Sequence, residues 1–127
     1  MSASTAKRDL DIGDIRNQDN YVSFNNGDPG RTGTGGTDVT TAIRAAGRVL
    51  IPSGAWAAIS NDGTKRRTSN SAAISFGNAV NTQVITHVIV WSAAVGGVCQ
   101  GVAASPFTST AGAPVTIAIG ALVVEAP

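Results

Sequence analysis

The stretch at residues 84–91 constrains the fold of this chain more than any other part of the sequence. It reads VITHVIVW, and every residue except His87 and Trp91 is β-branched, which favours a strand. Side chains alternate across a strand, and both faces of this one suit burial. The two faces are Val84, Thr86, Val88 and Val90 on one side and Ile85, His87, Ile89 and Trp91 on the other. We therefore predict a central strand that is covered on both sides.

The sequence around this strand carries no charge. Residues 68–124 contain no Asp, Glu, Lys or Arg, and charged residues make up only 13% of the chain, against roughly 25% in an ordinary soluble domain. A half without charges is poorly suited to face water alone, so we expect other protein to surround it in a homo-oligomer. The candidate interface residues come from two apolar strands and are Val84, Thr86, Val88, Val90, Val115, Ile117 and Ile119.

Length, charge and cysteine content exclude several classes of protein. A chain of 127 residues suits one domain. A net charge of +1 gives no strong attraction to nucleic acid or to an anionic membrane surface, and polar residues interrupt every apolar run that could insert into a membrane. Cys99 is the only cysteine, which excludes an intrachain disulfide and a cysteine zinc site. The first residues lack the apolar core of a signal peptide, so we expect synthesis and assembly in a cytoplasm.

The N-terminal segment differs in character from the rest. Residues 1–20 hold seven of the seventeen charges and only sparse apolar residues, too few for a stable free helix. We predict an N-terminal arm over residues 1–20 and a β-sandwich domain over residues 21–127. The arm is either a flexible tail or a segment that orders on a neighbouring subunit, and in the second case its docking residues are Leu10, Ile12 and Ile15.

Short apolar runs separated by Gly, Pro, Asn and Asp predict about eight strands. Nine candidate runs fall near residues 21–24, 44–51, 56–59, 65–68, 72–76, 84–91, 98–104, 114–119 and 122–124. Residues 40–48 offer one or two helical turns as an alternative to a strand. Strands and turns at this spacing are typical of a sandwich or small barrel, so we predict an all-β, single-domain antiparallel β-sandwich that is jelly-roll-like.

Two segments are predicted to be exposed. Residues 25–38 are dense in Gly, Asn and Asp and form a long loop, and Asp62-Gly63 between extended runs predicts an outward-pointing hairpin. The glycine-rich run lacks the Lys-Ser/Thr of a phosphate-binding loop, and Asp28 with Asp38 gives few ligands for calcium. The exposed-loop candidates are Asp28, Arg31, Trp56, Lys65, Arg66 and Arg67.

His87 and Cys99 are the residues that invite a catalytic hypothesis, as a base and nucleophile across a hairpin. Pairing through the turn at residues 93–97 places Cys99 nearer Val90 than His87, however, and the flanking residues are apolar. The single glutamate, Glu125, excludes a glutamate pair for glycoside hydrolysis. We therefore predict a protein that is not an enzyme, with no catalytic residues, no cofactor and no metal ligands.

Several landmarks together resemble a known family. They are Tyr21-Val22, residues 27–30 and 35–40, residues 69–76, Thr86-His87, residues 91–97 and residues 118–122. Their order and spacing resemble small bacteriophage virion proteins of the tail-fibre or minor tail type. The chain departs from that pattern in having Ile89 where the family has a glycine, and a charged arm where members often begin with an apolar helical segment.

The resemblance implies a non-enzymatic virion component with a β-sandwich fold, on either the tail or the capsid. We predict a small self-associating surface protein, a minor tail or fibre type or a capsid decoration type, which contacts copies of itself and other virion proteins. Phage appendages are commonly trimeric, so by analogy we favour a trimer. The alternative is a module that binds host-surface glycan through residues 25–38 and Trp56.

Overall fold

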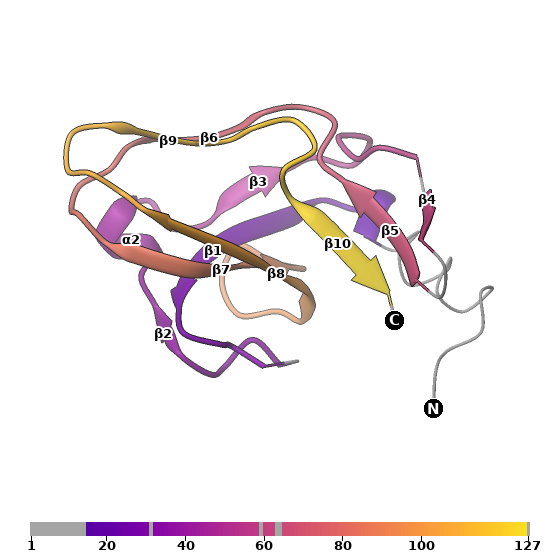
Figure 1. Cartoon of the computed structure of the whole chain (residues 1–127), viewed down its shortest axis with the longest axis horizontal. Coiled ribbons are helices and arrows are strands. Elements are labelled where there is room, and N and C mark those ends of the chain that lie inside the picture. Colours follow the sequence, from indigo (N-terminus) through magenta and orange to yellow (C-terminus); the bar gives the residue numbers. More distant parts are fainter. Residues whose placement is uncertain (1–14, 31, 59, 63–64, 127) are drawn as a thin grey trace.

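The structure is a computed structural model and describes residues 15–30, 32–58, 60–62 and 65–126. Short strands dominate it, with one four-residue helix among the labelled elements (Figure 1). In chain order the elements are β1 (Asn20–Asn26), β2 (Thr37–Asp38), α2 (Thr40–Ile43), β3 (Val49–Ile51), β4 (Ser60–Asp62), β5 (Lys65–Ser69), β6 (Ile74–Asn78), β7 (Val84–Trp91), β8 (Cys99–Thr108), β9 (Pro114–Ile117) and β10 (Val123–Ala126).

The strands form three antiparallel sheets. The largest has five strands in the order β2-β1-β7-β8, with β3 also paired to β1. A three-stranded sheet has the order β10-β5-β4, and β6 pairs with β9. The prediction of an antiparallel β-rich protein is confirmed. The described strands close no barrel, and the β-sandwich with its jelly-roll connectivity stays a prediction.

Strand β7 is central in the largest sheet, as its sequence predicts. It lies between β1 and β8, with Phe24 opposite Val88 and Val22 opposite Val90. Val88 and Val90 are fully buried, whereas Val84 at the start of the strand is 53% exposed. The strand therefore begins at the surface and ends in the interior.

The predicted alternation of β7 fails at one point. Ile85 belongs to the same core cluster as Val88 and Val90, although strict alternation places it on the opposite face. The register between β7 and β8 shifts between Ile85 and His87, and such an irregularity redirects side chains. Ile85 thereby gains a core position that the sequence pattern does not indicate.

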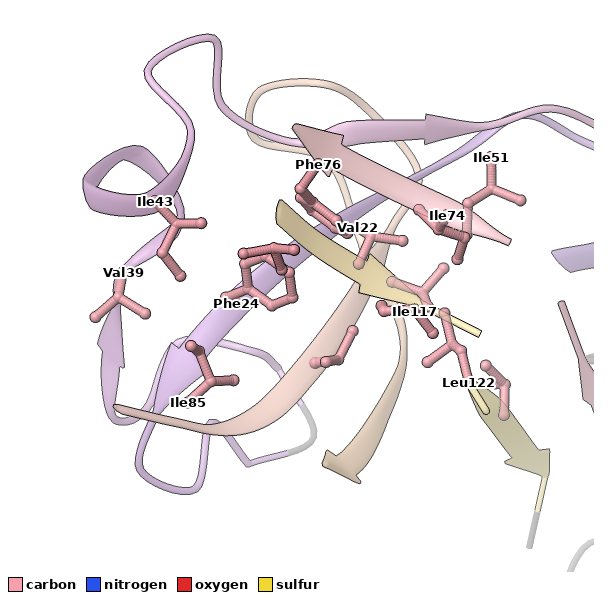
Figure 2. Close-up of a cluster of buried hydrophobic side chains, with 14 of the residues drawn as sticks. Val22, Phe24, Val39, Ile43, Ile51, Ile74, Phe76, Ile85, Ile117 and Leu122 are labelled. Carbon is pink, nitrogen blue, oxygen red and sulfur yellow. The ribbon is translucent and has the colours of Figure 1, made fainter. Parts of the chain in front are cut away.

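The core joins all three sheets around Phe24 on β1 (Figure 2). The ring of Phe24 lies 4.1 Å from that of Phe76 on β6 and 5.5 Å from that of Phe107 on β8, centroid to centroid. Ile74, Ile117 and Leu122 lie along the same cluster, as Figure 2 shows. A few large side chains thus hold the β6–β9 pair against the five-stranded sheet, since apolar burial is the main favourable term in folding.

Two predicted strands are shorter than expected. The run at residues 44–51 forms a strand only from Val49, because α2 and a turn precede it, with the amide of Gly47 donating to the carbonyl of Arg44. The helical alternative is thus confirmed for residues 40–43. The run at residues 56–59 contributes only an isolated bridge between Trp56 and Asn70. The hairpin itself is confirmed by the pairing of Asp62 with Lys65.

Candidate interaction surfaces

Trp91 is at the centre of the contacts on the outer face of the five-stranded sheet, which is the face away from the core cluster. Its indole Nε1 donates a hydrogen bond to Ser23 Oγ at 2.8 Å, and the guanidinium of Arg48 lies 4.2 Å from the ring centroid, within the range of a cation–π contact. Gly33 approaches so closely that an added Cβ would lie 2.7 Å from Trp91 Cη2. The ring is only 8% exposed beneath these groups.

The glycine-rich loop is held in place by contacts that its sequence does not reveal. Asn25 Nδ2 donates to the carbonyls of Gly27 and Gly35 at 2.9 and 3.1 Å, and the amide of Gly27 donates to Thr86 Oγ1 at 2.7 Å. Asp28 is exposed, as predicted. The loop is therefore a fixed cover over one face of the sheet.

Arg48 connects this face to the turn between β7 and β8. Its Nη1 donates to the carbonyls of Ala93 and Gly96 at 2.8 and 2.7 Å. Burial lowers the pKa of Arg48, and the nearby Asp38 carboxylate acts in the opposite direction. These bonds fix the turn, and Val95 within it is 88% exposed. The sequence pattern predicts the turn, but its one signal for the role of Arg48 is the place of this residue before an apolar strand.

The structure separates the seven predicted interface residues into three groups. Ile119 is 69% exposed and Val84 53% exposed, so both lie on the surface. Thr86 is half-buried and bonded to Gly27. The remaining four fill space between the sheets of their own subunit and are Val88, Val90, Val115 and Ile117. A clean alternation marks a buried face, but it does not say whether the same chain or another one covers that face.

The residues predicted to lie in exposed loops also differ from one another in burial. Trp56 was expected to be exposed, and this is wrong: the side chain is 4% exposed and belongs to the core. Arg67 on β5 is half-buried. Arg31 and the side chains of Lys65 and Arg66 lie outside the described residues. Of the predicted arm residues, Ile15 is buried, whereas Leu10 and Ile12 also lie outside the described residues.

Two grooves lie where sheets meet. One has a volume of about 440 Å³ and lies between β8 and β10, and the other has a volume of about 250 Å³ and lies between β3 and β6. The first is lined by Val102, Ala103, Ala104, Ala121 and Val123. The second is lined by residues 49–52, Ala55 and residues 72–75. Alanine and aliphatic side chains predominate in the lining of both grooves.

The geometry does not assemble a cysteine–histidine pair. Cys99 lies opposite Trp91 and His87 lies opposite Ala104, which confirms that Cys99 is nearer Val90 than His87 along the strand pair. Burial raises the pKa of the Cys99 thiol, with the Gly101 carbonyl acting in the opposite direction, so the reactive thiolate is disfavoured. His87 Nδ1 instead lies 2.8 Å from Thr86 Oγ1.

The part of the chain that the structure describes has neither a metal-binding cluster of His, Cys, Asp or Glu side chains nor a membrane-spanning helix. No cluster of three or more His, Cys, Asp or Glu side chains is placed to hold a metal ion there. No helix within those residues is long and apolar enough to cross a membrane. The surfaces that stand out are therefore the two grooves and the exposed aliphatic side chains.

Comparison with known proteins identifies a family match. A family model described as "Podophage GP4 fiber I protein gp80" matches residues 16–125. The matched segment begins directly after Ile15 and includes the three sheets almost to the end of β10. No curated protein matches the chain.

Proposed function

The chain belongs to the podophage GP4 fiber I protein gp80 family, a family of phage tail fibre proteins, and we propose that it is a non-enzymatic fibre subunit that self-associates through its uncharged half. The family resemblance noted in the sequence is thereby confirmed. The protein is a structural component of the virion, and of the two locations predicted for it the tail is the one that the family supports. The capsid location has no such support.

The observation that carries self-association is a set of exposed aliphatic side chains in the half of the sequence that has no charges. Within residues 68–124 the exposed large aliphatics are Val80, Val84, Val95, Val98 and Ile119. Soluble subunits normally intersperse charges among such residues. Contact with further copies of the chain and with other virion proteins would remove these side chains from water. We propose a trimer, by analogy with other phage appendages.

Native mass spectrometry of the full chain at micromolar concentration tests self-association. We expect a trimer as the main species, with its mass independent of moderate changes in salt because the contacts are uncharged. A spectrum that contains only monomer under these conditions contradicts the proposal. Gold labelling of intact particles, with label on the fibres and none on the heads, checks the position of the subunit independently.

The glycan-binding alternative lacks an aromatic platform for a sugar ring. All six aromatic residues lie within the described part of the chain, and none of them is exposed. Trp56, which that alternative requires at the surface, is in the core. The loop at residues 25–38 is bonded down onto the sheet. These observations support the structural role over recognition of host glycan.

A further inference from the structure

The end of β1 and the residue after it form the only Asn-Gly pair in the sequence, Asn26-Gly27. In such a pair the asparagine side chain can react with the next main-chain nitrogen, because glycine has no side chain to hinder the approach. Asn26 is exposed to water. Asn25 and Asn70, by contrast, are buried and donate hydrogen bonds through Nδ2. Asn26 is therefore the asparagine at which spontaneous modification has the fewest obstacles in its own side chain.

The reaction that this pair allows is deamidation through a cyclic imide. The Gly27 nitrogen attacks Cγ of Asn26 and forms a new C–N bond, and the bond from Cγ to Nδ2 breaks. The departing nitrogen takes up the proton of the attacking amide and leaves as ammonia. Water then opens the imide at either of its two carbonyls and leaves an aspartate or an isoaspartate. Water is the only reagent consumed.

The backbone conformation at this position opposes the first step. Asn26 pairs with Thr37 on β2, so its backbone is extended. In an extended backbone the next nitrogen lies away from the side chain, and ring closure requires the peptide group between Asn26 and Gly27 to rotate. Gly36 packs on this peptide group so closely that an added Cβ would lie 2.9 Å from the carbonyl oxygens of Asn26 and Gly27. Rotation therefore requires the neighbouring loop to move.

A hydrogen bond from β7 holds the same peptide group. The amide of Gly27 donates to Thr86 Oγ1 at 2.7 Å, across 59 residues of sequence, which is at the short end of the range for such bonds. Thr86 Oγ1 also lies 2.8 Å from His87 Nδ1 and 3.4 Å from the carbonyl oxygen of Asn25. Rotation of the peptide group would break the bond from Gly27 and leave its amide without this acceptor, which is unfavourable.

We propose that Asn26 is a self-modification site, which deamidates by attack of the Gly27 nitrogen, and that the Thr86 hydroxyl restrains this reaction while the subunit is folded. The inference is independent of the proposed self-association. It assigns to Thr86 a role beyond packing, because the hydroxyl determines how freely one peptide group rotates.

The product would change the attachment of the glycine-rich loop. Deamidation places a carboxylate at Asn26, two residues before Asp28. In the isoaspartate form the main chain runs through the side chain and gains one atom between β1 and the loop. Asn25 Nδ2 holds the loop by the carbonyls of Gly27 and Gly35, and the longer linkage shifts the first of these carbonyls. The modified fraction thus records how long the loop has been detached or the subunit unfolded.

Peptide mass spectrometry of the full chain tests the site. Samples are incubated at mildly alkaline pH in native buffer and in urea, and the deamidated fraction at Asn26 is followed with time. We expect a rate at least about tenfold lower in native buffer, because unfolding removes both the strand pairing and the bond to Thr86. Equal rates in the two conditions overturn the restraint. No product at Asn26 in the unfolded chain overturns the site itself.

A pair of matched variants identifies the restraining group. Thr86→Val removes the hydroxyl and keeps a branched side chain, and Thr68→Val does the same on β5, where the lost bond is to the carbonyl of Ala57 at 2.7 Å. We expect Thr86→Val to raise the rate at Asn26 in native buffer about fivefold, and Thr68→Val to leave it nearly unchanged. Thr86→Ser, which keeps the hydroxyl, should restore the slow rate.

Two outcomes contradict the role of the hydroxyl. If Thr86→Val and Thr68→Val accelerate deamidation equally, in proportion to their loss of stability in urea unfolding, global opening and not the bond to Gly27 sets the rate. If Thr86→Val slows the reaction, the hydroxyl assists removal of the Gly27 proton, and restraint is the wrong assignment.

Discussion

The two faces of the β1–β7 strand pair are built by different physical means. On the inner face, Phe24 and Val88 are paired and fully buried in a core of aliphatic and aromatic side chains. On the outer face, Trp91 is covered by a hydrogen bond to Ser23, by a guanidinium and by a close glycine. The same two strands thus have one face that is covered by packed apolar side chains and one that is covered mainly by directed polar contacts.

The two faces have different roles: one stabilises the fold, and the other positions segments at the surface. Apolar packing is non-directional and contributes in proportion to buried area, so the inner face determines whether the subunit folds. Directed contacts position particular atoms, and on the outer face they fix the glycine-rich loop and the turn that carries Val95. Changes on the inner face should therefore reduce global stability most, and changes on the outer face should reduce it less and should also alter these two surface segments.

Phe24→Ala is expected to have the largest effect. Removal of a fully buried ring that contacts Phe76 and Phe107 leaves a cavity between sheets, and such changes reduce the free energy of unfolding by about 3–5 kcal/mol. Urea unfolding measures the loss. Ser75→Ala on the exposed face of β6 is the control and should change it little. A loss below about 1 kcal/mol for Phe24→Ala would show that the inner face is not the main source of stability.

Gly33→Ala tests the cover of the outer face. Gly33 has φ +76° and no room for a Cβ against Trp91, whereas Gly30 has φ +69° and nothing within 4 Å of an added Cβ. We expect Gly33→Ala to reduce stability by about 2–3 kcal/mol and Gly30→Ala by about 1 kcal/mol, because both have backbone strain but only the first adds a clash. Thermal unfolding and tryptophan fluorescence measure the difference. Equal effects would mean that the loop moves away from Trp91 without loss.

Arg48→Ala removes the connection between the outer face and the turn at residues 93–97. The loss of two bonds to the carbonyls of Ala93 and Gly96, and of the contact with Trp91, should reduce stability by about 1–2 kcal/mol. We expect faster proteolysis within the turn. Arg44→Ala is the control, because it loses bonds to the carbonyls of Gly47 and Arg48 and none to the turn that follows β7. In this variant the turn after β7 should be cleaved at nearly the wild-type rate. Identical digestion of all three proteins is the contrary outcome.

The smallest effect concerns Cys99, at the edge of the outer face. Burial raises the pKa of its thiol, so alkylation in the folded protein should reach half its maximal rate at a higher pH than in the unfolded chain. The same shift contributes stability that is present below the pKa of the unfolded thiol and is lost as the pH rises through the folded pKa. Cys99→Ser should remove that part of the pH dependence. Matching alkylation profiles in folded and unfolded chains would contradict burial of the thiol.

Sequence patterns identified the strands better than they identified what covers them. The position of β7 and its pairing with β8 followed from β-branched residues and a glycine turn. Trp56 was misplaced because a tryptophan between two alanines near a hairpin gives no sign of the bridge to Asn70. Arg48 was missed because its partners are backbone carbonyls far along the chain, and no side-chain pattern encodes them.

The sequence by itself determined an antiparallel β-rich chain, a central strand, a charge-free half and membership of a phage tail fibre family. These properties depend on local composition and order, which period-2 patterns and residue types express directly. Only the tertiary structure decided which apolar strands fill their own subunit's core and which edges stay open. Ile85 turns inward through a register shift, and β8 and β10 meet without pairing. Both outcomes depend on the angle and distance between sheets, which no stretch of sequence specifies alone.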